Sequence, residues 1–242
     1  MTEFSNELGF VEVLIRMRGY AESSPAVTRT IDNMPLIEKF WMFWATPWLE
    51  KVQRVGEFYW LLKTQYYYRF FWGHIGKRSK IIQPMRLRNV HNIQVGVNVI
   101  ISRFAFLITL QESETVVPQL TIGDGCRIGH MNHIACIREV RIGANVLTAD
   151  RVFISDHSHG FSDINVPILQ QPLKSKGEVS IGEGTWIGEN ACVISCHIGR
   201  NCVIGSNAVV LGDVPDYCVA VGAPARIIRR MNPESGPKTV NR

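Results

Sequence analysis

The sequence predicts a mainly β protein, a parallel β-helix, and the prediction rests on a six-residue repeat. From Ile122 onward an aliphatic residue returns every six positions, a glycine often follows it, and a small residue often stands four positions after it. A period of six matches neither the 3.6-residue period of a helix nor the alternation of an ordinary strand pair. We therefore expect each hexad to form one short strand and a turn, and three hexads to close one triangular coil.

The aliphatic positions fall into two blocks, and we expect their side chains to point into the bore of the coils. The positions are Ile122, Ile128, Ile134, Ile142, Thr148 and Ile154, then Ile181, Ile187, Val193, Ile198, Ile204 and Val210. The spacing changes by two residues in the first block and by one in the second, which we interpret as bulged corners. Weaker repeats reach back to Ile75, so about seven coils are expected over residues 73–230. Asparagines such as Asn145 and Asn207 suit the strained turns between strands.

Residues 1–72 differ from the rest, because they contain nearly all the tryptophan and little glycine. Pro47 is expected to start or kink a helix that continues to Tyr68, and Asp32 or Asn33 to cap an earlier helix. Apolar side chains recur along it at helical spacing, at Trp48, Leu49, Val52, Val55, Phe58, Tyr59 and Leu62. This row would pack on a neighbouring element or subunit, or would lie at a membrane surface, since Lys and Arg are interleaved with its aromatic residues.

The charges of the chain disfavour two classes of protein. Six charged residues interrupt the aromatic stretch from Phe40 to Trp72, so it lacks the ~18 uninterrupted apolar residues of a membrane-spanning helix. A net charge of +5 without a dense Lys/Arg block disfavours nucleic acid and suits a small polyanionic ligand, such as a phosphorylated cofactor.

Six cysteines without a CxxC pair, and no signal-peptide pattern, favour free buried thiols in a reducing cytoplasm. We expect a cytoplasmic location, either free or peripheral to the inner face of the cytoplasmic membrane.

The hexads of residues 73–230, two thirds of the chain, resemble those of the hexapeptide-repeat transferase superfamily. The resemblance implies a left-handed coil and a homotrimer with its active sites between subunits. Three later segments are similar to the acetyl-CoA-dependent acetyltransferase branch: Trp186-Ile187-Gly188, Asp213-Val214-Pro215 and Val221-Gly222-Ala223-Pro224-Ala225-Arg226. The segment Ile154-Ser155-Asp156-His157-Ser158-His159-Gly160 resembles the polysaccharide O-acetyltransferases. Residues 231–242 form a tail beyond the repeat.

The repeat is interrupted at residues 156–178, and in the resembling family such an excursion reaches over the cleft between subunits. His157 stands at its root and matches the family's catalytic histidine. A neutral imidazole there would take the proton of a sugar hydroxyl as the oxygen attacks the thioester. Asp156 would hold the imidazole tautomer or cap the turn, and His159 would orient the loop. His133 would contact the acceptor sugar, on the family's pattern, or would simply be exposed at a corner.

The resemblance also assigns residues to the acetyl donor. The backbone of Gly205, Ser206 and Asn207 would bind the pantetheine arm of acetyl-CoA in the groove between two β-helices, and Trp186 would line that groove or pack locally. Arg226 and Arg229 would meet the phosphates of coenzyme A, or form a solvated charge pair. Where relatives often carry Thr-Lys, this chain has Leu211-Gly212. One phosphate contact is therefore missing, and cofactor affinity would depend more on the arginines.

The expected function is an O-acetyltransferase that moves acetyl from acetyl-CoA to a sugar hydroxyl of a bacterial surface polysaccharide, such as an O-antigen, capsule or exopolysaccharide, or of its precursor. Transfer would be direct, with no metal and no covalent route through Cys192 or Cys196. An amino-sugar N-acetyltransferase is the nearest alternative, followed by a serine O-acetyltransferase. The histidines His130, His133, His157 and His159 keep a γ-type carbonic anhydrase with zinc in view, and a non-enzymatic scaffold is a further class. The acceptor sugar, its hydroxyl and its carrier stay open.

Overall fold

A computed structural model describes residues 35, 48–112 and 114–231 of the chain. The caps expected at Asp32 or Asn33 and the helix start expected at Pro47 lie outside these residues. The chain divides into two compact units, residues 1–62 and 63–242. Residues 63–72, which we assigned to the extension, therefore belong to the same compact unit as the repeats.

The first unit contributes one described helix, α4 (Trp48–Leu62). The expected apolar row is present on it, and its members Val52, Val55, Tyr59 and Leu62 are all exposed. These residues are spaced at 3, 4 and 3 positions, so they lie on one face of the helix. Among the described residues, no helix has the length and apolar character needed to cross a membrane.

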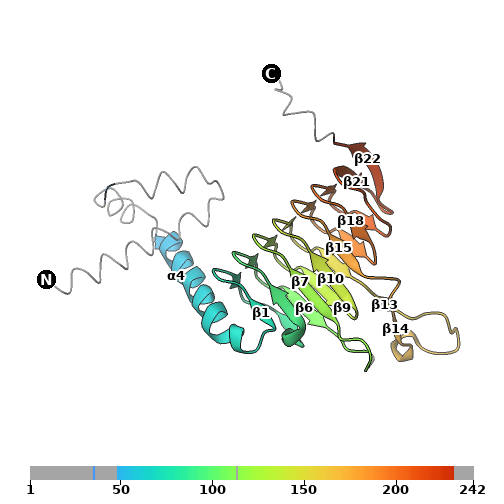
Figure 1. The fold of residues 1–242 in the computed structure, drawn as a ribbon, viewed down its shortest axis with the longest axis horizontal. Coiled ribbons are helices and arrows are strands. Elements are labelled where there is room, and N and C mark those ends of the chain that lie inside the picture. The colour runs from blue at the N-terminus through green and yellow to red at the C-terminus, as the bar shows by residue number, and fades with distance from the viewer. Residues whose placement is uncertain (1–34, 36–47, 113, 232–242) are drawn as a thin grey trace, which may run out of the picture. The chain divides into compact units, whose positions relative to one another are not determined.

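The second unit is a left-handed parallel β-helix with three flat sides (Figure 1). Sheet A contains β1 (His74–Ile75), β4 (Ile93–Val95), β7 (Gln119–Ile122), β10 (Glu139–Ile142), β15 (Val179–Ile181) and β18 (His197–Ile198). Sheet B contains β2 (Lys80–Ile81), β5 (Ile100–Ile101), β8 (Arg127–Ile128), β11 (Leu147–Thr148), β16 (Trp186–Ile187), β19 (Val203–Ile204), β21 (Cys218–Val221) and β22 (Arg226–Arg230). Sheet C contains β3 (Arg86–Arg88), β6 (Phe106–Thr109), β9 (His133–Cys136), β12 (Phe153–Ser155), β17 (Cys192–Ile194) and β20 (Val209–Val210).

Each coil contributes one strand to every sheet, which gives six complete coils. A seventh coil begins where Val214 bridges to Ile198 and continues in β21, against which β22 turns back antiparallel. The prediction of about seven coils is thus confirmed. Residues 63–72 cover the first coil at the opposite end, since the N–H of Ile81 donates to Oγ1 of Thr64 at 2.9 Å and Nε2 of Gln65 donates to the carbonyls of Gly76 and Ser79.

The aliphatic positions of the repeat form the core, as predicted. Every one of the twelve positions from Ile122 to Val210 is at most 2% exposed. Identical positions of successive coils pair in register, for example Ile134 with Ile154 and Ile154 with Val193, so each side of the bore is a stacked apolar row. The expected turn asparagines adopt left-handed backbone conformations, with φ of 55° at Asn145 and 60° at Asn207.

The excursion of residues 156–178 leaves at the corner between sheets C and A and projects from the stack (Figure 1). Its stem is a short antiparallel pair, β13 (Ser158–His159) with β14 (Leu173–Lys174), and its far part contains the 3-10 turn Ile168–Gln170. A second, shorter excursion occupies residues 110–118 at the same corner, between β6 and β7. This second excursion was not predicted from the sequence. The two irregular spacings of the repeat, before Ile142 and before Ile198, also fall at this corner.

Candidate active site

Asp156 occupies the corner at the end of β12, and its side chain is fully buried. Its carboxylate accepts three consecutive peptide N–H groups of the preceding coil: Ile137 at 2.9 Å, Arg138 at 2.6 Å and Glu139 at 2.9 Å. The thiol of Cys136 lies 3.6 Å from the same carboxylate. A buried carboxylate is stable only if its oxygens are satisfied, and here the turn between β9 and β10 supplies the donors.

The environment of Asp156 acts on its pKa in both directions. Burial raises the pKa, whereas the hydrogen bonds from His157, Ile137 and Arg138 and the charge of His157 lower it, and the net result lies below the ordinary value. The group is therefore ionised at neutral pH. An ionised carboxylate can only accept hydrogen bonds, so each group that hydrogen-bonds to it must donate the proton.

His157 follows Asp156 directly, and its Nδ1 lies 2.8 Å from Oδ1 of Asp156. Because the carboxylate can only accept, Nδ1 carries the proton in the neutral ring, and Nε2 keeps its lone pair. Ser155 adds further restraint, since its Oγ accepts the peptide N–H of His157 at 3.2 Å and donates to the carbonyl of His157 at 2.9 Å. The His157 side chain is 11% exposed. The arrangement gives an oriented imidazole whose outer nitrogen can accept a proton.

His133 lies on the outer face of sheet C, one coil before His157. Its ring packs between Phe106 and Phe153, with centroid distances of 5.3 and 5.2 Å. Burial lowers the pKa of His133, and the charges of His157 and Arg86 lower it further. The side chain is half-buried rather than free at a corner, and it is neutral at neutral pH, so it can both donate and accept a hydrogen bond.

His159 is exposed on β13, where it pairs with Leu173 across the stem of the excursion. The same stem places the carbonyl of Pro172 3.0 Å from the N–H of Gly160. His159 is therefore part of the hairpin that connects His157 to the rest of the loop. No hydrogen bond joins it to His157 or Asp156 among the described residues.

Trp186 and Arg229 lie on one outward row of sheet B. The register runs from Trp186 to Val203, then to Val219 and Arg229. Trp186 is half exposed, and Arg229 is exposed. Arg226 lies at the start of β22 and borders a cavity of about 510 Å³ that Leu211, Asp213 and Pro224 also line. The two arginines thus occupy the same end of the β-helix.

Gly205, Ser206 and Asn207 form the turn from β19 to β20. The N–H of Gly205 donates to the carbonyl of Ala220 and that of Asn207 to the carbonyl of Glu189, both at 2.9 Å. These two bonds hold neighbouring coils together. Within the described part of the chain, only Ser206 of the three has a backbone N–H without an acceptor, so it is the N–H that a ligand can use.

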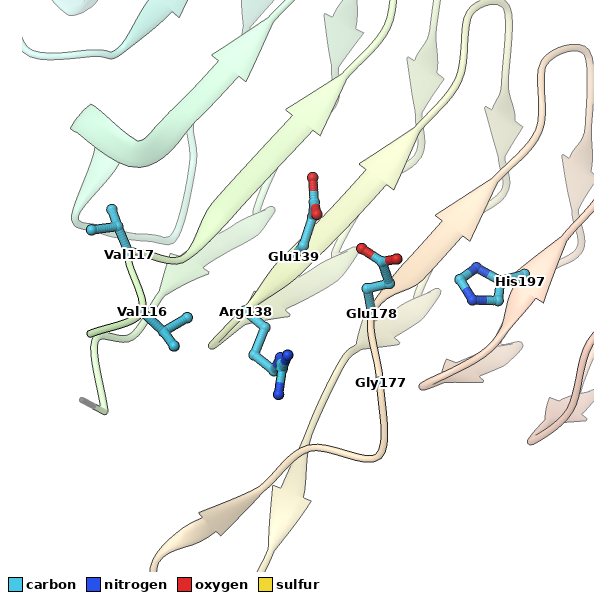
Figure 2. Close-up of a pocket in the computed structure, with 7 residues that line it drawn as sticks. All are labelled: Val116, Val117, Arg138, Glu139, Gly177, Glu178 and His197. Atoms are coloured by element: carbon cyan, nitrogen blue, oxygen red, sulfur yellow. The ribbon is translucent and has the colours of Figure 1, made fainter. Parts of the chain in front are cut away.

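A polar cavity of about 480 Å³ lies on the sheet A side of the Asp156 corner (Figure 2). Its lining residues are Val116, Val117, Arg138, Glu139, Gly177, Glu178 and His197. Figure 2 shows the carboxylates of Glu139 and Glu178 close together, and Arg141 forms ion pairs with both. Arg138 and Glu139 also give their peptide N–H groups to Asp156. This cavity was not predicted from the sequence, because it depends in part on the unpredicted excursion of residues 110–118.

The three sides of the β-helix differ in their outer surfaces. The outward row of sheet A is polar throughout: His74, Gln94, Thr121, Arg141, Ser180 and His197. The outward row of sheet C is mostly apolar or aromatic: Arg86, Phe106, His133, Phe153, Cys192 and Val209. Sheet B also has an apolar outward row, on which Leu147 and Trp186 are each 47% exposed, so both sheets differ from the polar sheet A.

Two of the buried cysteines, Cys126 and Cys196, offer little nucleophilic character. Burial raises the pKa of Cys196 to about 11 and that of Cys126 to about 11 as well. Such thiols are protonated at neutral pH, and the thiolate is the reactive form. Among the residues the structure describes, no three His, Cys, Asp or Glu side chains are grouped to hold a metal ion. His130, considered above as a zinc ligand, has its Nδ1 3.1 Å from Asp150.

Comparison with known proteins relates the chain to acetyltransferases, although no family model matches it. It is 33% identical over 184 residues to the putative lipopolysaccharide biosynthesis O-acetyl transferase WbbJ of Escherichia coli, covering 72% of this chain and 87% of WbbJ. It is 36% identical over 99 residues to the galactoside O-acetyltransferase of Escherichia coli, covering 38% and 45% of the two chains. It is 44% identical over 111 residues to a probable acetyltransferase of Mycobacterium tuberculosis, covering 46% and 37%. The matches span less than half the length of the last two relatives.

Among solved structures, the fold is similar to that of AntD, an N-acyltransferase of Bacillus cereus solved in complex with dTDP and 3-hydroxybutyryl-CoA. The TM-score is 0.60 at 19% sequence identity, and the match covers 70% of this chain and 88% of AntD. The fold and the relatives together define the class of protein: an acyltransferase enzyme built on the left-handed β-helix. More particularly, the chain belongs to the acetyltransferase family of WbbJ, of the sugar and lipopolysaccharide type.

Proposed function

We propose that this protein transfers acetyl from acetyl-CoA to a sugar hydroxyl of a bacterial surface polysaccharide or its precursor, with His157 as the general base. The observation that carries the proposal is the 2.8 Å contact between Nδ1 of His157 and the buried, ionised Asp156. A base needs a fixed tautomer and a free lone pair, and this pair provides both. His157 also stands at the root of the excursion, on a rigid coil.

The reaction needs little more than a base, because the thioester is already activated. As the acceptor oxygen attacks the acetyl carbonyl carbon, its proton passes to Nε2 of His157. The C–S bond then breaks, and the imidazolium returns the proton to the departing thiolate of coenzyme A. Asp156 stabilises the transient imidazolium through Nδ1 and stays ionised throughout. In this proposal the neutral His133 would hydrogen-bond the acceptor, and His159 would position the loop.

The proposed donor site runs along sheet B toward the C-terminal end of the β-helix. Trp186 would contact the pantetheine arm, and the N–H of Ser206 would hydrogen-bond one of its amides. Arg229 lies on the same outward row as Trp186. Arg229 and Arg226 would bind the phosphates, since guanidinium groups pair well with phosphate oxygens. The backbone of Gly205 and Asn207 would shape the turn, because their N–H groups are already used.

We further propose that the protein is a homotrimer. The support is the apolar outward row of sheet C, where Phe106, Phe153, Cys192 and Val209 are neither polar nor fully buried. Packing this side against a neighbouring subunit would remove it from water and would place the acceptor beside His133 and His157. Sedimentation equilibrium of the purified protein measures this directly, and a monomeric mass would overturn it.

The protein would act in the cytoplasm or at the inner face of the cytoplasmic membrane, where residues 1–72 would attach it peripherally. The exposed row of α4 supports this attachment. Membrane fractionation of the chain with and without residues 1–72 tests it, and equal solubility of the two would count against it.

A transfer screen tests the proposed activity. Radiolabelled acetyl-CoA is offered with bacterial surface-glycan precursors, and products are located by mass spectrometry. The proposal predicts an acetyl ester on a sugar hydroxyl with the natural chain and no product with His157→Ala. An acetamide on an amino sugar would show the N-acetyltransferase alternative instead. Label transfer that is unaffected by His157→Ala would overturn the assignment of the base.

A further inference from the structure

The end of the β-helix that carries its first coil has an unusual charge. Residues 58–111 contain eight Lys or Arg residues and no Asp or Glu, although the whole chain has a net charge of only +5. The remainder of the chain is therefore net negative. Five of the eight cations lie within the first coil, residues 74–88: Lys80 is buried, and the other four, Lys77, Arg78, Arg86 and Arg88, are exposed. Among the described residues, none of these four forms an ion pair.

Exposed aromatic side chains lie at the same end. Residues 63–72 cover the first coil through Thr64 and Gln65, and this cover presents Tyr66, Tyr67, Phe70 and Phe71 outward. Phe70 is 86% exposed and Tyr66 is 72% exposed. We call the part of the second unit formed by residues 66–88 the basal end. It lies at the opposite end of the stack from β22 (Figure 1).

We propose that the basal end is a further surface, besides the α4 row, by which the protein docks on a membrane containing anionic phospholipid. Lys and Arg side chains near a bilayer are attracted by anionic headgroups, and Tyr and Phe rings settle at the boundary between headgroups and acyl chains. The combination of the two selects a lipid surface over a soluble polyanion. A soluble polyanion would use the cations but would leave the four aromatic rings in water. The surface belongs to the second unit, whereas the row on α4 belongs to the first.

Docking by this end has a consequence for the acceptor, and this consequence rests on the proposed function. His157 follows β12, in the fourth coil, and successive coils are spaced by ~4.8 Å. The general base would therefore lie roughly 15 Å, or three coil spacings, from the first coil, and the cover of residues 63–72 adds to its distance from the lipid headgroups. The acceptor that fits this height is a glycan still attached to its membrane lipid, with the acetylated sugar a short distance from the carrier.

Vesicle co-sedimentation of the full chain tests the docking surface. The protein should bind vesicles in which about a third of the lipid is phosphatidylglycerol, should bind phosphatidylcholine vesicles weakly, and should be released by salt. Replacing three cations, Lys77→Gln with Arg78→Gln and Arg88→Gln, should lower partitioning of the protein onto the vesicles about 100-fold, from about five-fold for each cation. The matched control removes three cations elsewhere, Arg141→Gln with Arg151→Gln and Arg200→Gln. This variant should change partitioning onto the vesicles by less than about five-fold.

The aromatic residues are tested separately. Phe70→Ser with Phe71→Ser should weaken binding at high salt, where the charges are screened, and Leu211→Ser with Ile228→Ser at the opposite end should not. Thermal melting confirms that each variant is folded. The proposal is overturned if the natural chain ignores anionic vesicles, if both triple variants bind alike, or if Val55→Ser with Tyr59→Ser on α4 abolishes binding while the basal variants retain it. Dextran sulfate that binds as tightly as vesicles, regardless of Phe70 and Phe71, would also overturn it.

The height of the acceptor is tested by activity on matched lipid-linked and water-soluble glycans. The basal triple variant should lose turnover on the lipid-linked glycan in vesicles and keep it on the soluble one. Loss on both substrates, or on neither, contradicts the inference. Failure of the proposed function would look different, because the natural chain would then bind vesicles yet acetylate no glycan.

Discussion

The peptide N–H of Arg138 donates to the carboxylate of Asp156 at 2.6 Å, across the boundary between two successive coils. The bond ties the turn after β9 to the residue that orients His157. The orientation of the base therefore depends on the stacking of the coils as well as on its own loop. Ile137 and Glu139 complete the set of donors.

Replacing the carboxylate by an amide should damage both activity and stability. Asp156→Asn presents an amide NH₂ group toward three N–H donors, so at least one of them loses its acceptor in a buried site. We expect the variant to be less stable by about 1–3 kcal/mol and its kcat to fall by at least about 100-fold. Chemical unfolding and steady-state kinetics measure the two effects. Natural kcat in the folded variant would contradict the role given to Asp156.

The same carboxylate predicts how stability changes with pH. The pKa of Asp156 is lower in the folded protein than its ordinary value, near 4. Its contribution to the free energy of unfolding is therefore fully present above the ordinary pKa and is lost as pH falls through the folded value. The stability difference between the natural chain and Asp156→Asn should be constant from about pH 7 to pH 5 and should shrink below about pH 4. Melting temperatures of both proteins across this range check it, and a gap that does not shrink in acid would contradict it.

His133 should affect acceptor binding more than the chemical step. Its ring is neutral at neutral pH, lies between Phe106 and Phe153, and can hydrogen-bond a sugar hydroxyl. His133→Phe preserves the aromatic packing and removes the hydrogen bond. We expect the acceptor KM to rise about 5- to 10-fold with kcat changed by less than about 3-fold. Met131→Ala, on the same coil, is the control and should leave both constants near their natural values.

Arg229 should affect the acetyl donor. Arg229→Gln is expected to raise the KM for acetyl-CoA about 5- to 10-fold, and less at high salt, because the guanidinium is exposed and its pairing with phosphate is screened. Arg200→Gln serves as the control, since Arg200 is also exposed but pairs with Asp216. Dephospho-acetyl-CoA lacks the 3′-phosphate. If Arg229 binds that phosphate, the KM values of Arg229→Gln and the natural chain should differ less with dephospho-acetyl-CoA than with acetyl-CoA. Equal effects of the two substitutions would contradict the assignment.

The fold could be predicted from the sequence because a solenoid builds its core from a local repeat. Ile134 and Ile154 are buried for the same reason as every other hexad position, so one pattern located the whole core. Turn positions such as Asn145 were predicted equally well, since a left-handed backbone conformation has a clear residue preference. The excursion of residues 156–178 was visible as a gap in the same pattern.

The candidate site could be predicted only in part. The sequence pointed to His157 but left Asp156 as either a cap or a partner of the imidazole. In the structure one carboxylate makes both kinds of contact, because its cap donors come from the preceding coil, about 20 residues away. No pattern marks these donors, since they are peptide N–H groups available to any residue. The cavity beside Glu178 was missed for a similar reason: the four segments that line it meet only once the coils are stacked.

One measurement tests the central claim most directly: kcat for acetyl transfer by His157→Ala, beside the dissociation constant of that variant for acetyl-CoA. We predict that kcat falls by at least about 100-fold while the dissociation constant stays within about 2-fold of the natural value. A folded His157→Ala protein that turns over within about 3-fold of the natural chain would contradict the account.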